Sequence, residues 1–182
     1  NGLAGRVFVA HAFGSRLAFV VFLVEIGVRL YTRYAIVYDV EMTRYANQLK
    51  IESKNPKIGH VHRPESSAFL MGVPVEINGD GFRDQDYPVE RTDAQRTVIL
   101  GDSLTFGWGV EREKTFEFLL EEELGRRAPA ELINFGTGNY NTEQEVNLFK
   151  DEGLKYAPDQ VVLFYFINDA EPTPVKSDWE FL

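Results

Sequence analysis

Three short apolar runs in the second half of the sequence constrain the fold more than any other feature. They cover residues 97–100, 132–135 and 161–167, and glycine or polar residues follow each of them at once. Uncharged runs of this length are typical of strands that are buried on both faces. Between the runs, residues 116–124 and a segment that begins near Thr142 have the apolar spacing of helices. This alternation predicts βαβ units on a parallel sheet, and therefore an α/β fold.

Local signals predict where several elements begin and end. Gly125 marks the end of the helix over residues 116–124. Thr142 is expected to cap the next helix, and Glu145, three residues later, would complete a capping box. Further upstream, residues 73–77 alternate weakly as a strand, and the Asn-Gly-Asp-Gly sequence at 78–81 indicates a turn.

The first thirty residues are the most apolar part of the chain. From residue 7 to residue 30 the only formal charges are Arg16, Glu25 and Arg29, and residues 17–24 are apolar without a break. A membrane-spanning helix needs about 20 mostly apolar residues. Residues 1–30 are therefore expected to form a transmembrane or retained signal-anchor helix, with Glu25 and Arg29 paired one turn apart. The alternative is a buried amphipathic helix of a soluble protein.

Residues 31–96 are expected to form an extension that is first helical and then β-rich. Its tyrosines fit either a membrane interface or the packed face of an ordinary helix: Tyr31, Tyr34, Tyr38 and Tyr45. Residues 1–64 carry 9 Lys/Arg and 4 Asp/Glu, whereas residues 65–182 carry 10 and 24. The basic part suits anionic headgroups, and the acidic part excludes nucleic acid as a partner. We therefore expect a membrane-anchored protein whose α/β domain is periplasmic or otherwise extracytoplasmic.

Polar residues follow all three expected strands at the ends where parallel α/β sheets bind ligands. They are Gly101-Asp102-Ser103 after the first strand, residues 134–142 after the second, and Asn168-Asp169 after the third. Because the carboxyl ends of parallel strands meet at one edge of the sheet, these Ser, Asn and Asp side chains are expected to converge. Their convergence indicates a functional site rather than three unrelated loops.

Residues 98–107, with the sequence Val-Ile-Leu-Gly-Asp-Ser-Leu-Thr-Phe-Gly, resemble the first conserved block of the SGNH/GDSL hydrolases. Residues 133–142 and 166–169 resemble the second and third blocks, and residues 78–84 are similar to a segment of membrane-anchored bacterial members. The resemblance implies a three-layer, flavodoxin-like SGNH-type domain over residues 97–182. It also implies a serine ester hydrolase or acyltransferase that acts on O-acyl esters, such as those on cell-envelope glycans, through an acyl-enzyme.

The same resemblance assigns a role to each matching position. Ser103 corresponds to the nucleophile. The oxyanion-hole donors would be the backbone N–H groups of Ser103 and Asn139 and the side-chain amide of Asn168. The supporting positions are Gly101, Asp102, Gly138 and Asp169. Two positions depart from the family pattern, since Asn139 and Phe166 stand where the family usually has glycine.

The catalytic base of this family is a histidine with an aspartate three residues before it, near the C-terminal end of the domain. The histidines of this chain are His11, His60 and His62, which all precede Ser103, and none has an aspartate three residues earlier. The C-terminal part of the domain is therefore expected to be absent from this chain. One alternative is a non-catalytic SGNH-like subunit of a membrane protein complex, and a weaker one is a carbohydrate-binding module.

The remaining ligand and partner expectations follow from the same residues. No cofactor and no metal is expected: His60 and His62 could share one side of a strand, but the sequence offers no third ligand beside them. A parallel sheet that stops at its third strand exposes an apolar edge, so we expect either a longer protein or a protein partner that covers this edge. The expected substrate is a glycan ester or another small acyl ester.

Overall fold

The computed structural model describes residues 2–172, and the side chains of residues 2–13 and of Asn168 lie outside its described part. The chain divides into two compact units, Asn1–Val40 and Glu41–Leu182. The last ten residues of the expected SGNH-type domain, 173–182, lie outside the described residues.

The first unit consists mainly of the long helix α1 (Gly2–Tyr34). Arg29 Nη2 lies 2.7 Å from Glu25 Oε1, so the predicted ion pair one turn apart is confirmed. Within the part of the chain that was described, no helix is both long and apolar enough to cross a membrane. The expected transmembrane helix over residues 1–30 is therefore not supported, because Arg16 and Glu25 bound the apolar run in the described part. The side chains of residues 1–13, which belonged to that expectation, lie outside it.

The second unit is built on a three-stranded parallel sheet in the order β6-β5-β7. The strands are β5 (Gln95–Leu100), β6 (Ala130–Asn134) and β7 (Gln160–Leu163). Val98 of β5 pairs with Ile133 of β6 on one side and with Val161 of β7 on the other. Helix α4 (Phe116–Gly125) connects β5 to β6, and α5 (Thr142–Leu148) connects β6 to β7. The predicted α/β fold with three parallel strands is confirmed and is consistent with an SGNH-like fold, although β7 ends at Leu163 rather than at residue 167.

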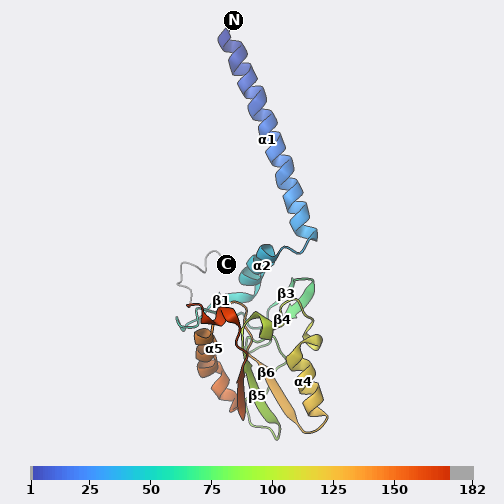
Figure 1. Cartoon of the computed structure of the whole chain (residues 1–182), viewed down its shortest axis with the longest axis vertical. Helices are drawn as coiled ribbons and strands as arrows, with labels where there is room; N and C mark the ends of the chain where they lie inside the picture. The colour runs from blue at the N-terminus through green and yellow to red at the C-terminus, as the bar shows by residue number, and fades with distance from the viewer. Residues whose placement is uncertain (1, 173–182) are drawn as a thin grey trace. The chain divides into compact units, whose positions relative to one another are not determined.

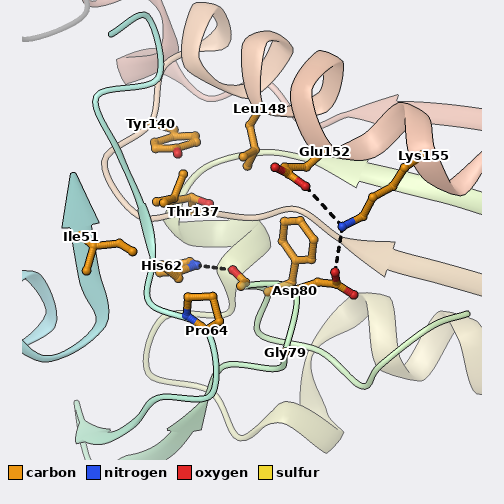
Figure 2. A pocket seen from close by; sticks show the side chains of 13 residues that line it. Ile51, His62, Pro64, Gly79, Asp80, Thr137, Tyr140, Leu148, Glu152 and Lys155 are labelled. Atoms are coloured by element: carbon orange, nitrogen blue, oxygen red, sulfur yellow. Dashed lines mark hydrogen bonds and ion pairs between the residues drawn. The ribbon is translucent and has the colours of Figure 1, made fainter. Parts of the chain in front are cut away.

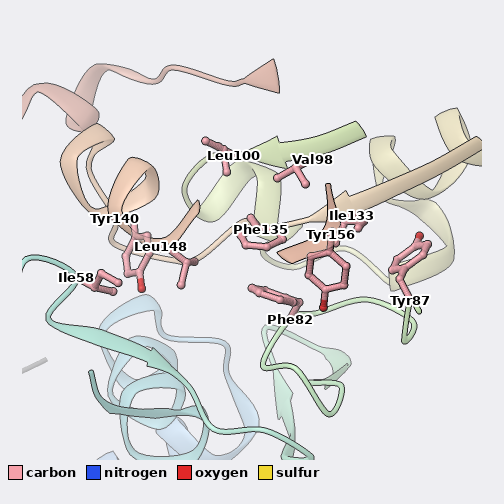
Figure 3. Packing of buried hydrophobic residues seen from close by; sticks show 10 residues of the cluster. All are labelled: Ile58, Phe82, Tyr87, Val98, Leu100, Ile133, Phe135, Tyr140, Leu148 and Tyr156. Carbon is pink, nitrogen blue, oxygen red and sulfur yellow. The ribbon is translucent and has the colours of Figure 1, made fainter. Parts of the chain in front are cut away.

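Side chains alternate across the sheet, so its two faces pack against different elements. Figure 1 shows α4 and α5 on opposite sides of the strands. One face contributes to the main buried cluster, which also includes residues from the α5 region and from the upstream extension (Figure 3): Ile58, Phe82, Tyr87, Val98, Leu100, Ile133, Phe135, Tyr140, Leu148 and Tyr156. The rings of Phe82 and Phe135 stack with their centroids 4.0 Å apart. On the other face, the Asn134 side-chain amide donates to the carboxylate of Glu117 on α4.

The extension from Glu41 onward belongs to the same compact unit as the sheet. It contains most of α2 (Tyr38–Leu49), an antiparallel pair formed by β1 (Lys50–Glu52) and β2 (His60–His62), and a hairpin formed by β3 (Ser67–Leu70) and β4 (Val73–Glu76). Its apolar side chains form a second buried cluster with one residue from the loop after β5: Tyr45, Leu49, Leu70, Val75, Ile77 and Phe106. Tyr45 therefore lies on the packed face of its helix, whereas three other tyrosines are exposed: Tyr31, Tyr34 and Tyr38.

The remaining helices are short and several of them lie near the carboxyl ends of the strands. They are α3 (Ser103–Phe106), η1 (Arg112–Lys114), η2 (Phe149–Gly153), η3 (Leu154–Tyr156) and η4 (Ile167–Ala170). Helix α4 ends at Gly125 as predicted. The predicted turn at 78–81 is confirmed, because Asn78 Oδ1 accepts the N–H groups of Asp80 and Phe82 at 3.1 and 2.8 Å.

The capping box of α5 lies one residue earlier than predicted. The N-cap is Asn141, not Thr142, and its Oδ1 accepts the N–H of Gln144 at 2.9 Å. The Gln144 side chain in turn accepts the N–H of Asn141 at 3.1 Å. Asn is at least as good an N-cap as Thr, so the helix starts after Asn141. Glu145 consequently has no capping role and is buried instead.

Candidate active site

Ser103 is the first residue of α3 and follows the central strand β5 directly. Asp102 caps this short helix, since its Oδ1 accepts the N–H of Leu104 at 2.9 Å, and its Oδ2 lies 3.4 Å from Ser103 Oγ. Gly101 leaves no room for a side chain, because a Cβ there would lie 2.0 Å from Thr105 Oγ1. The loop therefore holds the Ser103 hydroxyl, which is half-buried, at the carboxyl end of β5.

The second predicted loop follows β6 and packs directly against the first. The Thr137 N–H donates to the Gly101 carbonyl at 3.1 Å. Gly136 lies against the backbone of α3, since a Cβ added to it would lie 2.2 Å from the Phe106 nitrogen. The second contact needs a residue without a side chain, which the sequence provides at Gly136. They bring the first and second conserved blocks together at one edge of the sheet.

Two backbone donors in these loops bear directly on the predicted oxyanion hole: the N–H groups of Ser103 and Asn139. Among the described residues, neither the Ser103 N–H nor the Asn139 N–H has a hydrogen-bond partner. Asn139 adopts a φ of 68°, the left-handed conformation that Asn tolerates better than most other residues. Donors that are left open next to a serine nucleophile are what an oxyanion hole requires. Their assignment to that hole is a prediction from the resemblance.

The third predicted block lies in η4, after β7. Asp169 is 4% exposed, and its Oδ2 accepts the Phe166 N–H at 2.5 Å. The Asn141 side-chain amide donates to the Glu171 carbonyl at 2.8 Å, which ties the start of α5 to this segment. The side chain of Asn168 lies outside the described residues, so its role as an oxyanion donor stays a prediction.

Three carboxyl groups interact beneath these loops: Asp102, Glu145 and Asp169. Glu145 is 1% exposed, and neither of its carboxyl oxygens has a hydrogen-bond partner among the described residues. Burial, assisted by the negative charges of Asp169 and Asp102, raises the pKa of Glu145 to about 8. Burial likewise raises the pKa of Asp169. Glu145 is therefore neutral near pH 7, and sequence patterns gave no signal for this because its spacing indicated a cap.

Residues of the upstream extension form hydrogen bonds to the backbone of both loops. Tyr45 Oη accepts the Gly138 N–H at 2.9 Å and donates to His62 Nε2 at 2.6 Å. His62 Nδ1 donates to the Gly81 carbonyl at 3.2 Å, which fixes the neutral tautomer. Arg83 does the same for the first loop, since its guanidinium donates to carbonyls at the end of α3 and in the segment that follows it: Phe106, Gly107 and Val110. Sequence analysis did not assign these residues to the site, because partners 17 to 93 positions apart leave no local pattern.

The histidines are not placed as a base for Ser103. Both ring nitrogens of His62 are engaged, with Tyr45 and Gly81, and burial lowers its pKa to about 3. His60 Nε2 lies 3.3 Å from the Gly138 carbonyl, and burial lowers its pKa as well. The side chain of His11 lies outside the described part. Among the residues that are described, no group of three or more His, Asp or Glu side chains could hold a metal ion.

A cavity of about 280 Å³ lies between the extension, the second loop and the α5 region (Figure 2). Its walls are mostly apolar and include Ile51, Val61, Phe82, Tyr140 and Leu148. The polar groups on its wall are already paired, since Lys155 Nζ lies 2.7 Å from Asp80 and 3.2 Å from Glu152. Ser103 does not line this cavity, so it is not the site of the predicted chemistry.

Comparison with known proteins agrees with the geometry. No curated protein matches the chain. Residues 99–181 match the GDSL-like Lipase/Acylhydrolase family, and this matched part contains all three loops described above. The C-terminal part of the chain is therefore similar to the GDSL-like Lipase/Acylhydrolase family.

Proposed function

We propose that the chain carries the nucleophile and oxyanion hole of a serine ester hydrolase or acyltransferase that acts on O-acyl esters. The observation that carries the proposal is the pair of open N–H donors, at Ser103 and Asn139, on two loops that bond to each other at the carboxyl end of the sheet. The match of this segment to an esterase-type family supports the proposal.

The chemistry follows from the positions of these groups. Ser103 Oγ bonds to the carbonyl carbon of the ester, its proton passes to a base, and the carbonyl oxygen becomes an oxyanion. The N–H groups of Ser103 and Asn139, with the Asn168 amide, donate to this oxyanion, and each such donor contributes about 3–4 kcal/mol to the transition state. Collapse expels the alcohol and leaves an acyl group on Ser103. Water then releases it as an acid, or a second alcohol takes it in a transfer.

The charge around the site favours a neutral ester. The negative charges of Asp102 and Asp169 act on Glu145 beneath the loops, and residues 65–182 carry 24 acidic against 10 basic residues. A negative field of this kind repels anionic substrates and tolerates uncharged ones. An O-acylated sugar or a simple alkyl ester therefore fits better than a phosphoester or an acyl group that carries a carboxylate.

A second candidate is a non-catalytic SGNH-like subunit of a protein complex. It is favoured by two observations: within the described part, no histidine contacts Ser103, and the edge strand β7 with the residues after it is exposed although apolar. The side chains concerned are 36–80% exposed: Val161, Val162, Leu163, Phe164, Tyr165, Phe166 and Ile167. An apolar edge of this kind pairs readily with another strand. In this candidate the domain binds a protein partner, and Ser103 does not catalyse ester hydrolysis.

Labelling with a fluorophosphonate ester, together with hydrolysis of short-chain p-nitrophenyl esters, separates the two candidates. The purified chain is compared with Ser103→Ala and with Ser67→Ala, an exposed serine on β3. The enzyme proposal expects one adduct on Ser103, detected by intact mass and peptide mapping, and turnover that Ser103→Ala abolishes and Ser67→Ala retains. A chain that neither forms the adduct nor hydrolyses any ester would contradict the proposal and favour the non-catalytic subunit.

A further inference from the structure

One peptide unit of the second loop accepts a hydrogen bond from a partly buried lysine, Lys50. The carbonyl oxygen of Gly138 accepts a hydrogen bond from Lys50 Nζ at 3.1 Å, and His60 Nε2 lies 3.3 Å from the same oxygen. The N–H at the other end of this peptide unit is that of Asn139, which has no hydrogen-bond partner among the described residues. Lys50 and Gly138 are 88 positions apart in the sequence, and the fold brings them into contact.

Lys50 is an unusual residue for this position. It begins β1, and its ammonium group lies 4.4 Å from the centroid of the Tyr45 ring. Among the described residues, no carboxylate forms an ion pair with it. Burial lowers the pKa of Lys50 to about 7. A partly buried cation without a counter-charge is costly, and groups with a shifted pKa are found preferentially at functional sites.

The preceding peptide unit is fixed as well, so the loop cannot turn away from Lys50. The Gly138 N–H donates to Tyr45 Oη at 2.9 Å. A side chain at position 138 is excluded, because a Cβ there would lie 2.8 Å from the Tyr45 ring. Tyr45 is itself held by His62. Lys50 therefore acts on a peptide that has one orientation.

We propose that Lys50 is a positioning residue that polarises the Gly138–Asn139 peptide and so strengthens the Asn139 N–H as a donor to the oxyanion formed at Ser103. A cation that bonds to a carbonyl oxygen withdraws electron density through the amide, and hydrogen bonds in a chain strengthen one another. The positive charge also favours negative charge on the far side of the peptide. This inference rests on the proposed function, since it names what supports one of the donors of that site.

The test compares Lys50→Met with the conservative Lys50→Arg and with Lys54→Met, an exposed lysine four positions along the same segment. Removing one oxyanion donor outright costs about 100- to 1,000-fold in rate. Lys50 acts through the peptide, so we expect Lys50→Met to lower kcat and the fluorophosphonate labelling rate about 10-fold, with KM unchanged. Lys50→Arg should restore most of the rate, and Lys54→Met should not change it. A thermal melt checks folding, and Lys50→Met should not lower the melting midpoint because it removes a partly buried charge that has no counter-charge.

The second readout is the amide resonance of Asn139 in a ¹H–¹⁵N spectrum. It should move upfield in Lys50→Met and stay near its wild-type position in Lys54→Met. In the wild type, the chemical shift of this resonance should titrate near pH 7. This transition should be absent in Lys50→Met. The groups that face Lys50 are Tyr45 on α2 and His60 and His62 on β2, and burial keeps all three uncharged at that pH. Glu145, beneath the same loops, titrates near pH 8 and is unchanged in Lys50→Met, so the part of the transition that this variant removes belongs to Lys50.

The outcomes separate the inference from the proposed function. If wild-type Ser103 forms no adduct, both the proposed function and the role of Lys50 in it are refuted. If Ser103 is labelled but Lys50→Met is labelled at the wild-type rate, or leaves the Asn139 resonance in place, the inference alone is refuted. A slower label with a shifted Asn139 resonance supports both.

Discussion

Replacing Arg96 by Met should destabilise the fold more than any exposed arginine replacement. The Arg96 side chain is fully buried at the start of β5, and its Nε donates to Glu131 Oε2 at 2.5 Å. Its two Nη atoms donate to backbone carbonyls, including that of Tyr156 at 2.6 Å and that of Pro88 at 3.0 Å. One guanidinium therefore joins the extension, β6 and the end of η3 to the strand that carries Ser103.

The magnitude follows from what the Met variant leaves behind. Glu131, whose side chain is 14% exposed, loses its cation, and the carbonyls lose their donors. Breaking a buried ion pair by removing one partner costs about 3–5 kcal/mol. A domain of about 150–250 residues loses about 2–4 °C in Tm for each kcal/mol, so the melting midpoint should fall by about 6–20 °C.

Differential scanning calorimetry at pH 7 measures this shift directly. The matched control is Arg126→Met, which also removes an arginine from an ion pair with a glutamate. The side chains of Arg126 and Glu123 are 70% and 47% exposed, so this variant should lose less than about 0.5 kcal/mol. If Arg96→Met melts within 2 °C of the wild type, the reasoning that a buried guanidinium holds the start of β5 is wrong.

Three further predictions concern the loops of the candidate site. Burial raises the pKa of Glu145 from 4.5 to about 8, so its contribution to stability is complete below about pH 4.5 and is lost progressively as the pH rises through 8; Glu145→Gln, which stays neutral, should equal the wild type in stability at pH 4 and should be about 3–5 kcal/mol more stable at pH 9, by urea unfolding. Gly101→Ala should lower stability by at least about 1–3 kcal/mol and should reduce labelling of Ser103, because its Cβ would lie 2.0 Å from Thr105 Oγ1; a normal melt would show that the loop has more room. Tyr45→Phe should cost about 1–3 kcal/mol, because it leaves the Gly138 N–H and His62 Nε2 without their shared partner, and faster hydrogen exchange at the Gly138 amide is its specific signature.

The sheet and its loops could be predicted because their signals are local. An uncharged run such as residues 97–100 is compatible with few environments other than a strand buried on both faces, and the structure has one there. The capping box was predicted one residue late, since Asn141 and Thr142 are both good caps and only packing decides between them. The helical character of the N-terminal segment could also be read from the sequence, whereas its assignment to a membrane, which depended on apolar content and on basic and aromatic residues, is not supported.

The support of the site could not be predicted, because it depends on contacts between distant positions. Tyr45 and Lys50 meet Gly138 across 93 and 88 positions, and His60 meets it across 78. Each residue alone has an ordinary explanation: an aromatic on a helix, a lysine after it, a histidine on a strand. Their shared function is visible only when the fold brings them to one peptide.

These contacts change how the extension before the sheet should be understood. An extension that was only a spacer would bury apolar surface against the domain and would form no hydrogen bonds to the loops of the site. Residues 41–96 instead bond to the backbone of both loops, through Arg83 at the end of α3 and through Tyr45 and Lys50 at Gly138. A backbone N–H that must stay open for an oxyanion cannot stabilise its own loop by a hydrogen bond. The orientation of such a loop therefore has to be fixed by hydrogen bonds to its other backbone groups. The extension supplies those bonds, and it is therefore a structural part of the site that the GDSL-like segment alone would not contain.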